Sequence, residues 1–126
     1  MIRILHTADW HIDSPLRSFS DLQRRQLRAS LLEVPGKIAD ICIREGCDLV
    51  LLAGDVFDGP YTQEGYEAVY RALEQMAVPV FLAPGNHDPY RAGSPWTEEV
   101  WPDNVYLFKY PEITSYSIRE LDCRIY

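Results

Sequence analysis

Three short aliphatic runs constrain the fold of this chain more than any other feature. They lie at residues 2–5, 49–53 and 78–83, and polar or glycine residues follow each of them. Such runs are typical of strands that are buried in a sheet. The intervals between them carry apolar residues at helical spacing: Leu27, Leu31, Val34, Ile38, Ile41 and Cys42 in the first, and Tyr66, Val69, Tyr70, Leu73 and Met76 in the second. This alternation of strand and helix predicts an α/β domain with a parallel sheet and right-handed crossovers.

Pro35 interrupts the first helical segment, but the apolar spacing continues through it. We therefore expect one kinked helix or two abutting helices, ending at Gly46. Residues 89–104 are rich in Pro, Gly and Trp without a period, which predicts a long loop before a fourth strand at 105–108. Residues 113–126 predict two further strands joined by a turn. Because the last residues alternate like a strand that is just beginning, we expect the chain to be a fragment of a longer protein.

The charge balance narrows the function classes. The 126 residues include 12 Lys and Arg against 19 Asp and Glu, for a formal net charge of -7. Such a chain is poorly suited to gripping nucleic acid through bulk charge, so any contact with DNA must be local. The three cysteines lack a metal-finger spacing and fit a reduced protein better than a disulfide framework. No stretch resembles a signal peptide or a bilayer-spanning helix, and we expect a cytoplasmic protein with no membrane partner.

Candidate metal ligands follow each of the three predicted strands. In open parallel sheets, ligands bind outside the carboxyl ends of the strands, where these groups would meet. Carboxylates, an amide oxygen and imidazoles, with no thiolate among them, suit Mn, Fe, Zn or Mg rather than a structural zinc cage. The residues concerned are Asp9 and His11 after the first strand, Asp55 after the second, and Asn86, His87 and Asp88 after the third.

Each of these residues also has an ordinary structural interpretation. Asp9 and Asp55 could cap the segments that follow them, and Asn86 could form an Asx turn. Taken one at a time, these alternatives are at least as good as a metal site. Taken together, three consecutive strands carry such groups at one edge, and this favours the metal site. His6 is interpreted as the polar residue of a strand end and is not included.

Three other features keep two interpretations. The four arginines at 17–28 could contact DNA phosphates, but an acidic residue lies among them, and a solvated helix face is favoured. Trp96, Trp101 and Tyr90 could stack on unpaired bases, and packing of their loop over the sheet edge is at least as good an explanation. Asp58 could support a ligand, an interpretation that we favour slightly over a helix cap.

Three motifs resemble the first three signature motifs of the calcineurin-like metallophosphoesterases. They are residues 6–11 (HTADWH), 52–58 (LAGDVFD) and 84–88 (PGNHD). Within them, Thr-Ala-Asp-x-His and Gly-Asp-x-Phe-Asp are similar to the SbcD-type DNA repair exonucleases, and residues 12–16 (IDSPL) are similar to one bacterial branch of that group. The resemblance implies the first half of a two-sheet αββα sandwich, truncated. Residues 1–126 would be the N-terminal part of the domain, without its C-terminal ligand motifs or any capping domain.

The resemblance also implies a role for each candidate residue. Asp9 and His11 would bind one divalent cation, Asp55 would bridge two, and Asn86 would bind the second. The cations would be Mn2+ first, with Fe, Zn and Mg as alternatives, and they would activate water for hydrolysis. His87 would face the scissile phosphate, and Asp88 would orient its imidazole.

In function, the resemblance implies a metal-dependent phosphodiesterase that acts on DNA ends, an exonuclease of double-strand break repair. Its partner would be a coiled-coil ATPase of the SbcC kind, and a homodimer would be in keeping with the family. The alternatives are a phosphodiesterase or phosphatase acting on a nucleotide or other small phosphoester, and a non-catalytic DNA- or partner-binding fragment. The family has further histidines downstream, including a Gly-His-x-His motif, whereas this chain has none after His87. We therefore expect this chain alone to bind metal weakly and to have little or no nuclease activity.

Overall fold

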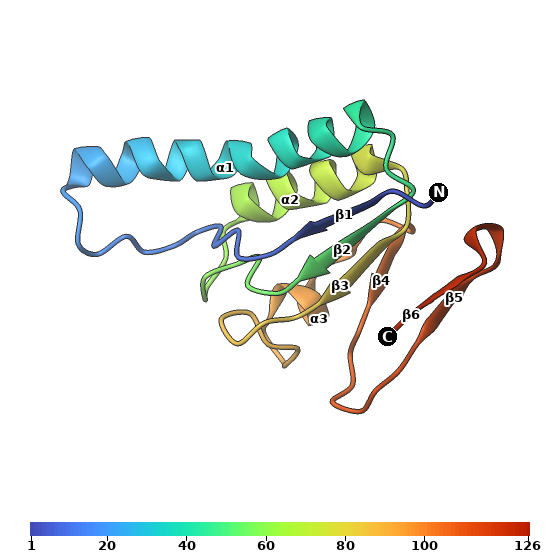
Figure 1. Ribbon diagram of the computed structural model, residues 1–126. Helices are drawn as coiled ribbons and strands as arrows, with labels where there is room; N and C mark the ends of the chain where they lie inside the picture. Colours follow the sequence, from blue (N-terminus) through green and yellow to red (C-terminus); the bar gives the residue numbers. More distant parts are fainter.

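The aliphatic runs form a four-stranded parallel sheet in the order β1-β2-β3-β4. The computed structural model describes all residues, 1–126, and Figure 1 shows the strands lying side by side. The strands are β1 (Ile4–Thr7), β2 (Leu49–Ala53), β3 (Val80–Ala83) and β4 (Val105–Leu107). In the paired register, Thr7 lies beside Leu52, and Ala53 lies beside Ala83. The carboxyl ends of the first three strands therefore meet at one edge of the sheet.

Two long helices connect these strands. Helix α1 (Asp21–Arg44) begins with a capping box, in which the Ser20 hydroxyl accepts from the Gln23 amide and the Gln23 side chain accepts from the Ser20 amide. It continues as one helix through the buried Pro35, so of the two expected arrangements the single helix is the one that forms. Gly46 follows its end at a φ of 61°, the left-handed conformation expected of a residue that ends a helix.

Helix α2 (Gln63–Met76) is capped by the Thr62 hydroxyl, which accepts from the Gly65 amide. Both long helices lie on the same face of the sheet, as Figure 1 shows. Alternate residues of β2 and β3 point into this layer and form the core with the helices. The core members from these four elements include Val50, Leu52, Val80 and Leu82 of the sheet, Ala39 and Cys42 of α1, and Val69, Ala72, Leu73 and Met76 of α2. The α/β class is confirmed.

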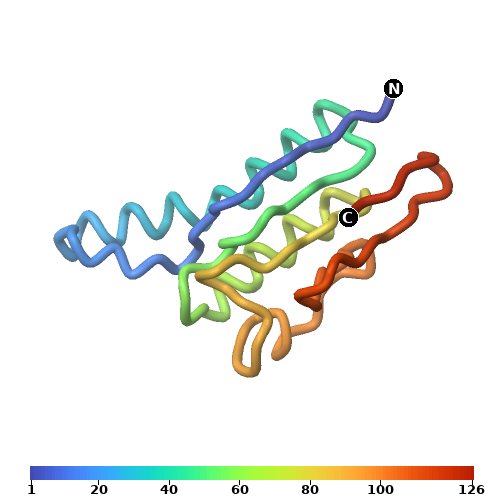
Figure 2. Tube along the Cα trace, turned by 60° about the horizontal axis from the view of Figure 1, so that its bottom comes forward, coloured from blue at the N-terminus to red at the C-terminus, as the bar shows by residue number.

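The opposite face of the sheet carries the end of the chain. Strands β5 (Tyr116–Ile118) and β6 (Cys123–Ile125) form an antiparallel hairpin joined by a single 3-10 turn, as the sequence predicted. The ring of Tyr116 packs against Phe81 of β3 and Tyr106 of β4, with ring centroids 5.8 and 5.3 Å apart. Figure 2 shows the hairpin on the β4 side of the sheet.

The long loop before β4 is more ordered than expected, because it contains the short helix α3 (Pro95–Glu98). Trp96 in this helix is only 4% exposed, and its ring packs against Phe57 and Trp101. Packing, rather than stacking on bases, is therefore the role of these two tryptophans, and Tyr90 alone of the three aromatic candidates stays exposed. None of the helices combines the length and the apolar character that crossing a membrane would require.

Candidate active site

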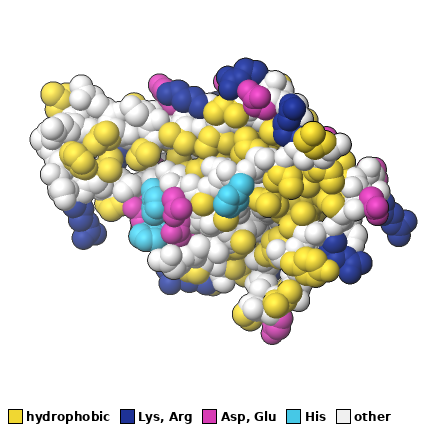
Figure 3. Space-filling view, viewed as in Figure 1, with side chains coloured by type: hydrophobic (Ala, Val, Ile, Leu, Met, Phe, Trp, Pro, Cys, Tyr) yellow, Lys and Arg dark blue, Asp and Glu magenta, His cyan; other side chains and the backbone are white.

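The predicted ligands occupy the loops at the carboxyl ends of β1, β2 and β3. Asp9, His11 and Asp55 all adopt left-handed backbone conformations, with φ values of 57°, 49° and 51°. Such values are uncommon for residues with a side chain and occur where the chain must turn sharply, often at functional sites. On the face shown in Figure 3, histidine and acidic side chains gather beside one another at this edge.

The first two loops are joined backbone to backbone. The parallel pairing of β1 with β2 continues past the strand ends, and Ile12 forms an isolated bridge with Phe57. Four backbone hydrogen bonds of 2.9–3.0 Å hold the loops: Asp9 donates to Gly54, His11 to Asp55, Ile12 to Val56, and Asp58 to Ile12. The positions of the candidate ligands on these two loops are therefore fixed relative to each other.

The second and third loops approach closely through two glycines. A Cβ on Gly54 would lie 2.8 Å from the Cα of Gly85, and a Cβ on Gly85 would collide with the backbone and carboxylate of Asp55. Gly54 also has a φ of 82°, which a side chain would strain. The Gly-Asp and Gly-Asn pairs of the two motifs are thus explained by close packing of their loops.

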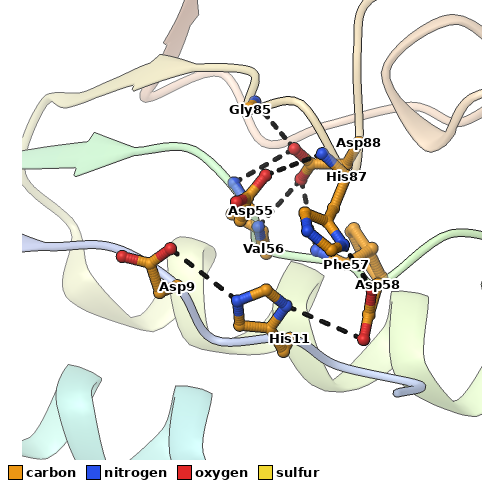
Figure 4. Close-up of polar contacts among 9 residues, drawn as sticks. All are labelled: Asp9, His11, Asp55, Val56, Phe57, Asp58, Gly85, His87 and Asp88. Atoms are coloured by element: carbon orange, nitrogen blue, oxygen red, sulfur yellow. Dashed lines mark hydrogen bonds and ion pairs between the residues drawn. The ribbon is translucent and has the colours of Figure 1, made fainter. Parts of the chain in front are cut away.

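The buried carboxylate of Asp88 links the second and third loops through hydrogen bonds to their backbones. Its side chain is 2% exposed, and its carboxylate accepts four backbone N–H groups, as Figure 4 shows. The donors are Gly85 at 2.7 Å, Val56 at 2.8 Å, Asp55 at 3.1 Å and Phe57 at 3.2 Å. Burial raises the pKa of the Asp88 carboxyl, and the four amide donors oppose that rise. The Trp96 indole fastens the same loop by donating to the Asp88 carbonyl at 2.6 Å.

Asp9, His11 and Asp55 converge closely enough to share one ion. One donor atom from each lies within 4.8 Å of the other two, and His11 Nε2 is 3.7 Å from Asp9 Oδ1. Two carboxylates and an imidazole are suitable ligands for a divalent transition metal, so these residues fit such an ion. Asp55 Oδ1 accepts from the backbone N–H of His87 at 2.8 Å, which sets the direction of this carboxylate. Asn86 lies exposed in the third loop, and its side chain makes no hydrogen bond.

A second cluster contains His11, His87 and Asp58. Asp58 Oδ1 lies 2.6 Å from His87 Nδ1, and Asp58 Oδ2 lies 3.8 Å from His11 Nδ1. The two imidazoles meet edge to face, with ring centroids 5.0 Å apart, so Asp58 lies between them (Figure 4). The hydrogen bond with Asp58 is the main cause that raises the pKa of His87. Burial alone would raise the pKa of Asp58, but hydrogen bonds with Ser14 and His87 lower it.

The expected role of Asp88 is therefore wrong in one respect. Its carboxylate is directed at backbone amides and not at the imidazole of His87, and the carboxylate beside that imidazole is Asp58. The physical reason is burial: Asp88 points under its own loop, where only N–H groups can satisfy it. The support role considered for Asp58 from the sequence is the one that the geometry favours.

Sequence reasoning also missed the contacts of Asp13. Its carboxylate accepts the backbone N–H of Thr62 at 2.7 Å and the Thr62 hydroxyl at 3.0 Å, which ties the first loop to the start of α2. A Cβ on Gly65 would collide with this carboxylate. Gly65 was the available signal for this close approach of Asp13 to α2. Glycine has a low helix propensity, so a glycine in the first turn of a helix indicates that another group comes too close for a side chain.

Comparison with known proteins agrees with these motifs. Residues 2–123 match the model of the calcineurin-like phosphoesterase family. The chain is 32% identical over 114 residues to the uncharacterized metallophosphoesterase YhaO of Bacillus subtilis, covering 85% of this chain and 28% of that protein. It is 38% identical over 94 residues to the D component of the nuclease SbcCD of Rhodobacter capsulatus, covering 70% of this chain and 22% of the relative. It is 31% identical over 98 residues to the DNA double-strand break repair protein Mre11 of Saccharolobus solfataricus, covering 74% and 24%.

The chain spans about a quarter of the length of these curated relatives. The family match nevertheless extends over nearly all of its residues, and it includes every loop that carries a candidate ligand. The donor groups at the sheet edge are compatible with a divalent metal site. On both grounds, this chain belongs to the calcineurin-like phosphoesterase family.

Proposed function

We propose that the protein is a metal-dependent phosphodiesterase that acts on DNA ends, an exonuclease of the SbcD type. Family membership supports a phosphoester hydrolase, and relatives named as nucleases and as a DNA double-strand break repair protein favour DNA as the substrate. The observation that carries the proposal is the juxtaposition of two clusters that share His11, namely His11 with Asp9 and Asp55, and His11 with Asp58 and His87, each compatible with a cation.

Two divalent cations, Mn2+ first, would be held by Asp9, His11, Asp55 and Asn86. When bound, they would supply positive charge to the phosphate and promote ionisation of the attacking water. The surrounding residues already orient the Asp55 carboxylate for the proposed position between the two cations. One of its oxygens is already oriented by the His87 amide at 2.8 Å, and the carboxylate has a second oxygen. Asp58, by contrast, is engaged with His87 and is proposed as a positioning residue and not as a ligand.

His87 is proposed as the group that faces the scissile phosphate. Its Nδ1 is occupied by Asp58 at 2.6 Å, so Nε2, on the other side of the ring, is the nitrogen that can donate to a phosphate or leaving-group oxygen. The raised pKa of His87 keeps that proton in place at a higher pH than for an isolated histidine. Asp88 does not take part in this proton transfer in our proposal, because its carboxylate binds backbone amides.

We propose that the remaining ligands and any capping domain lie elsewhere in a longer protein, because the relatives are about four times the length that matches. The proposed partner is a coiled-coil ATPase of the SbcC kind, with homodimer formation and a cytoplasmic location. These statements rest on the family resemblance and on relatives named as components of the SbcCD nuclease.

Digestion of end-labelled linear duplex DNA by the full-length protein in Mn2+ tests the proposal. We expect stepwise shortening from an end, its loss in Asp55→Ala, and no change in the surface control Asp103→Ala. Cleavage of bis-p-nitrophenyl phosphate without cleavage of DNA would support the small-phosphoester alternative. Binding of DNA with no hydrolysis of either substrate would support the non-catalytic alternative.

A further inference from the structure

A cavity of about 400 Å³ adjoins the candidate active site beside α1. It lies between the segment that leads from β1 into α1, helix α1 itself, and the loop that leads into α2. Figure 1 shows that segment running alongside the N-terminal half of α1. Asp58 lines this cavity and also contacts both histidines of the active site. A substrate bound at the histidines therefore has the cavity as its immediate neighbour.

Two arginines from different elements line this cavity. Arg17 comes from the segment before α1, and Arg28 comes from the N-terminal part of α1. Neither guanidinium lies within 4.0 Å of a carboxylate or makes a hydrogen bond, whereas Arg24, between them in sequence, pairs with Asp21. The sequence analysis favoured a solvated helix face for these arginines, and the ion pair of Arg24 agrees with it. That interpretation does not explain why Arg17 and Arg28 line the same cavity.

Three carboxylates line the same cavity, and two of them are already engaged. Asp13 accepts the amide and the hydroxyl of Thr62, and Asp58 is paired with His87. The third, Glu64, is exposed in the first turn of α2. Neither guanidinium is therefore paired with any of these three carboxylates, and the N–H donors of both arginines remain free for a ligand. Arginine's planar set of donors matches the oxygens of a phosphate, which makes a phosphate group the ligand best suited to this pair.

We propose that Arg17 and Arg28 bind a second phosphate of the DNA strand whose neighbouring phosphate is at the active site. The inference rests on the proposed function and adds a binding subsite to it. A monophosphate ester held at the histidines has no further phosphate for these arginines, whereas a polynucleotide does. The subsite would therefore favour DNA over small phosphoesters. It would also explain how a chain with a net charge of -7 makes a local contact with DNA.

DNA binding by the full-length protein tests the subsite separately from hydrolysis. Fluorescence anisotropy of a short labelled duplex, without divalent cation, is measured for Arg17→Ala, Arg28→Ala and the matched control Arg25→Ala. Arg25 lies on the same helix, is exposed, has no ion pair and does not line the cavity. We expect each cavity variant to weaken binding about tenfold and to reduce the slope of log affinity against log salt by about 1. The control should match the wild type, and Arg28→Lys should recover part of the loss.

Kinetics in Mn2+ give the second measurement. In the cavity variants, kcat/KM for DNA should fall about tenfold relative to kcat/KM for bis-p-nitrophenyl phosphate, since only DNA carries a second phosphate. Cavity variants that bind and cleave DNA like Arg25→Ala would overturn the subsite and leave the proposed function standing. A wild-type protein that binds DNA through these arginines but cleaves none would support the subsite and overturn the proposed nuclease.

Discussion

Replacing Asp88 with alanine removes the acceptor of four backbone amides at once. The affected N–H groups belong to the second and third site loops, and two of them, those of Val56 and Phe57, are on residues with no exposed surface. The other two, those of Gly85 and Asp55, belong to partly exposed residues that can reach water. The variant therefore leaves two donors buried without a partner and two that can be hydrated.

The size of the effect follows from the two buried donors. Each unsatisfied buried N–H costs about 1–3 kcal/mol, so together they cost about 2–6 kcal/mol. Loss of the buried carboxylate removes its own desolvation penalty, which offsets part of this cost. We expect Asp88→Ala to lower the free energy of unfolding by about 3 kcal/mol. Asp88→Asn keeps one acceptor oxygen and turns an NH2 group toward the remaining amides, and it should lose about half as much.

Urea unfolding of the chain, followed by tryptophan fluorescence, measures this loss. Trp96 donates to the Asp88 carbonyl and lies close to the site of the change. Asp103→Ala, at an exposed aspartate with no hydrogen bond from its side chain, controls for the loss of one negative charge. A variant that is as stable as the wild type would refute our reasoning. That result would mean that the four amides do not depend on the Asp88 carboxylate.

Two further changes separate the electrostatic and packing contributions at the same edge. Asp58→Asn should lower the pKa of His87, measured by NMR titration of its Cε1–H in metal-free protein, and an unchanged pKa would contradict the pairing. Because the folded pKa of His87 is raised above 6.5, the pair contributes fully below that pH and loses its contribution as the pH rises through the raised pKa. Since the pKa of Asp58 is lowered, this group is charged at pH 5, and the stability difference between wild type and Asp58→Asn should be larger at pH 5 than at pH 9. Gly54→Ala should cost about 2–4 kcal/mol in urea unfolding, through its left-handed φ and its contact with Gly85. Gly59→Ala, with a φ of 89° and open space around it, isolates the backbone part, and equal losses at both positions would exclude the contact.

Much of the fold was predictable because burial in a parallel sheet leaves a clear apolar pattern. Residues 49–53 form β2 with the expected bounds, whereas β1 begins at Ile4 and not at residue 2. The start of β1 is set by its pairing with β2 and not by hydropathy. That pairing begins at Ile4, opposite Leu49. The apolar spacing in α1 begins only at Leu27, although the helix begins at Asp21. Figure 1 shows that its first turns extend beyond the sheet, so they carry no apolar stripe.

The site was predictable in place but not in every contact. Strand ends followed by Asp, His and Asn located the edge, because parallel strands deliver their carboxyl ends together. Sequence spacing could not show which carboxylate faces His87, since Asp58 and Asp88 both lie in site loops and differ only in the direction of their side chains. That direction depends on long-range packing. Trp96, whose ring packs against Phe57, donates to the Asp88 carbonyl and so fixes the backbone from which this side chain projects.

The hydrogen bonds between the site loops affect which substitutions this edge of the sheet can tolerate. Main-chain bonds link the first loop to the second, and Asp88 links the second to the third, so the loops do not depend on the side chains of Asp9 or His11 for their shape. Binding of an ion would therefore not have to order a flexible segment, and neither would replacement of a proposed ligand residue. The conformational entropy of these loops is lost when the chain folds and not when an ion binds. Substitution at the proposed ligand positions Asp9 and Asn86, which are exposed, would therefore change the donor groups while the scaffold beneath them stays the same.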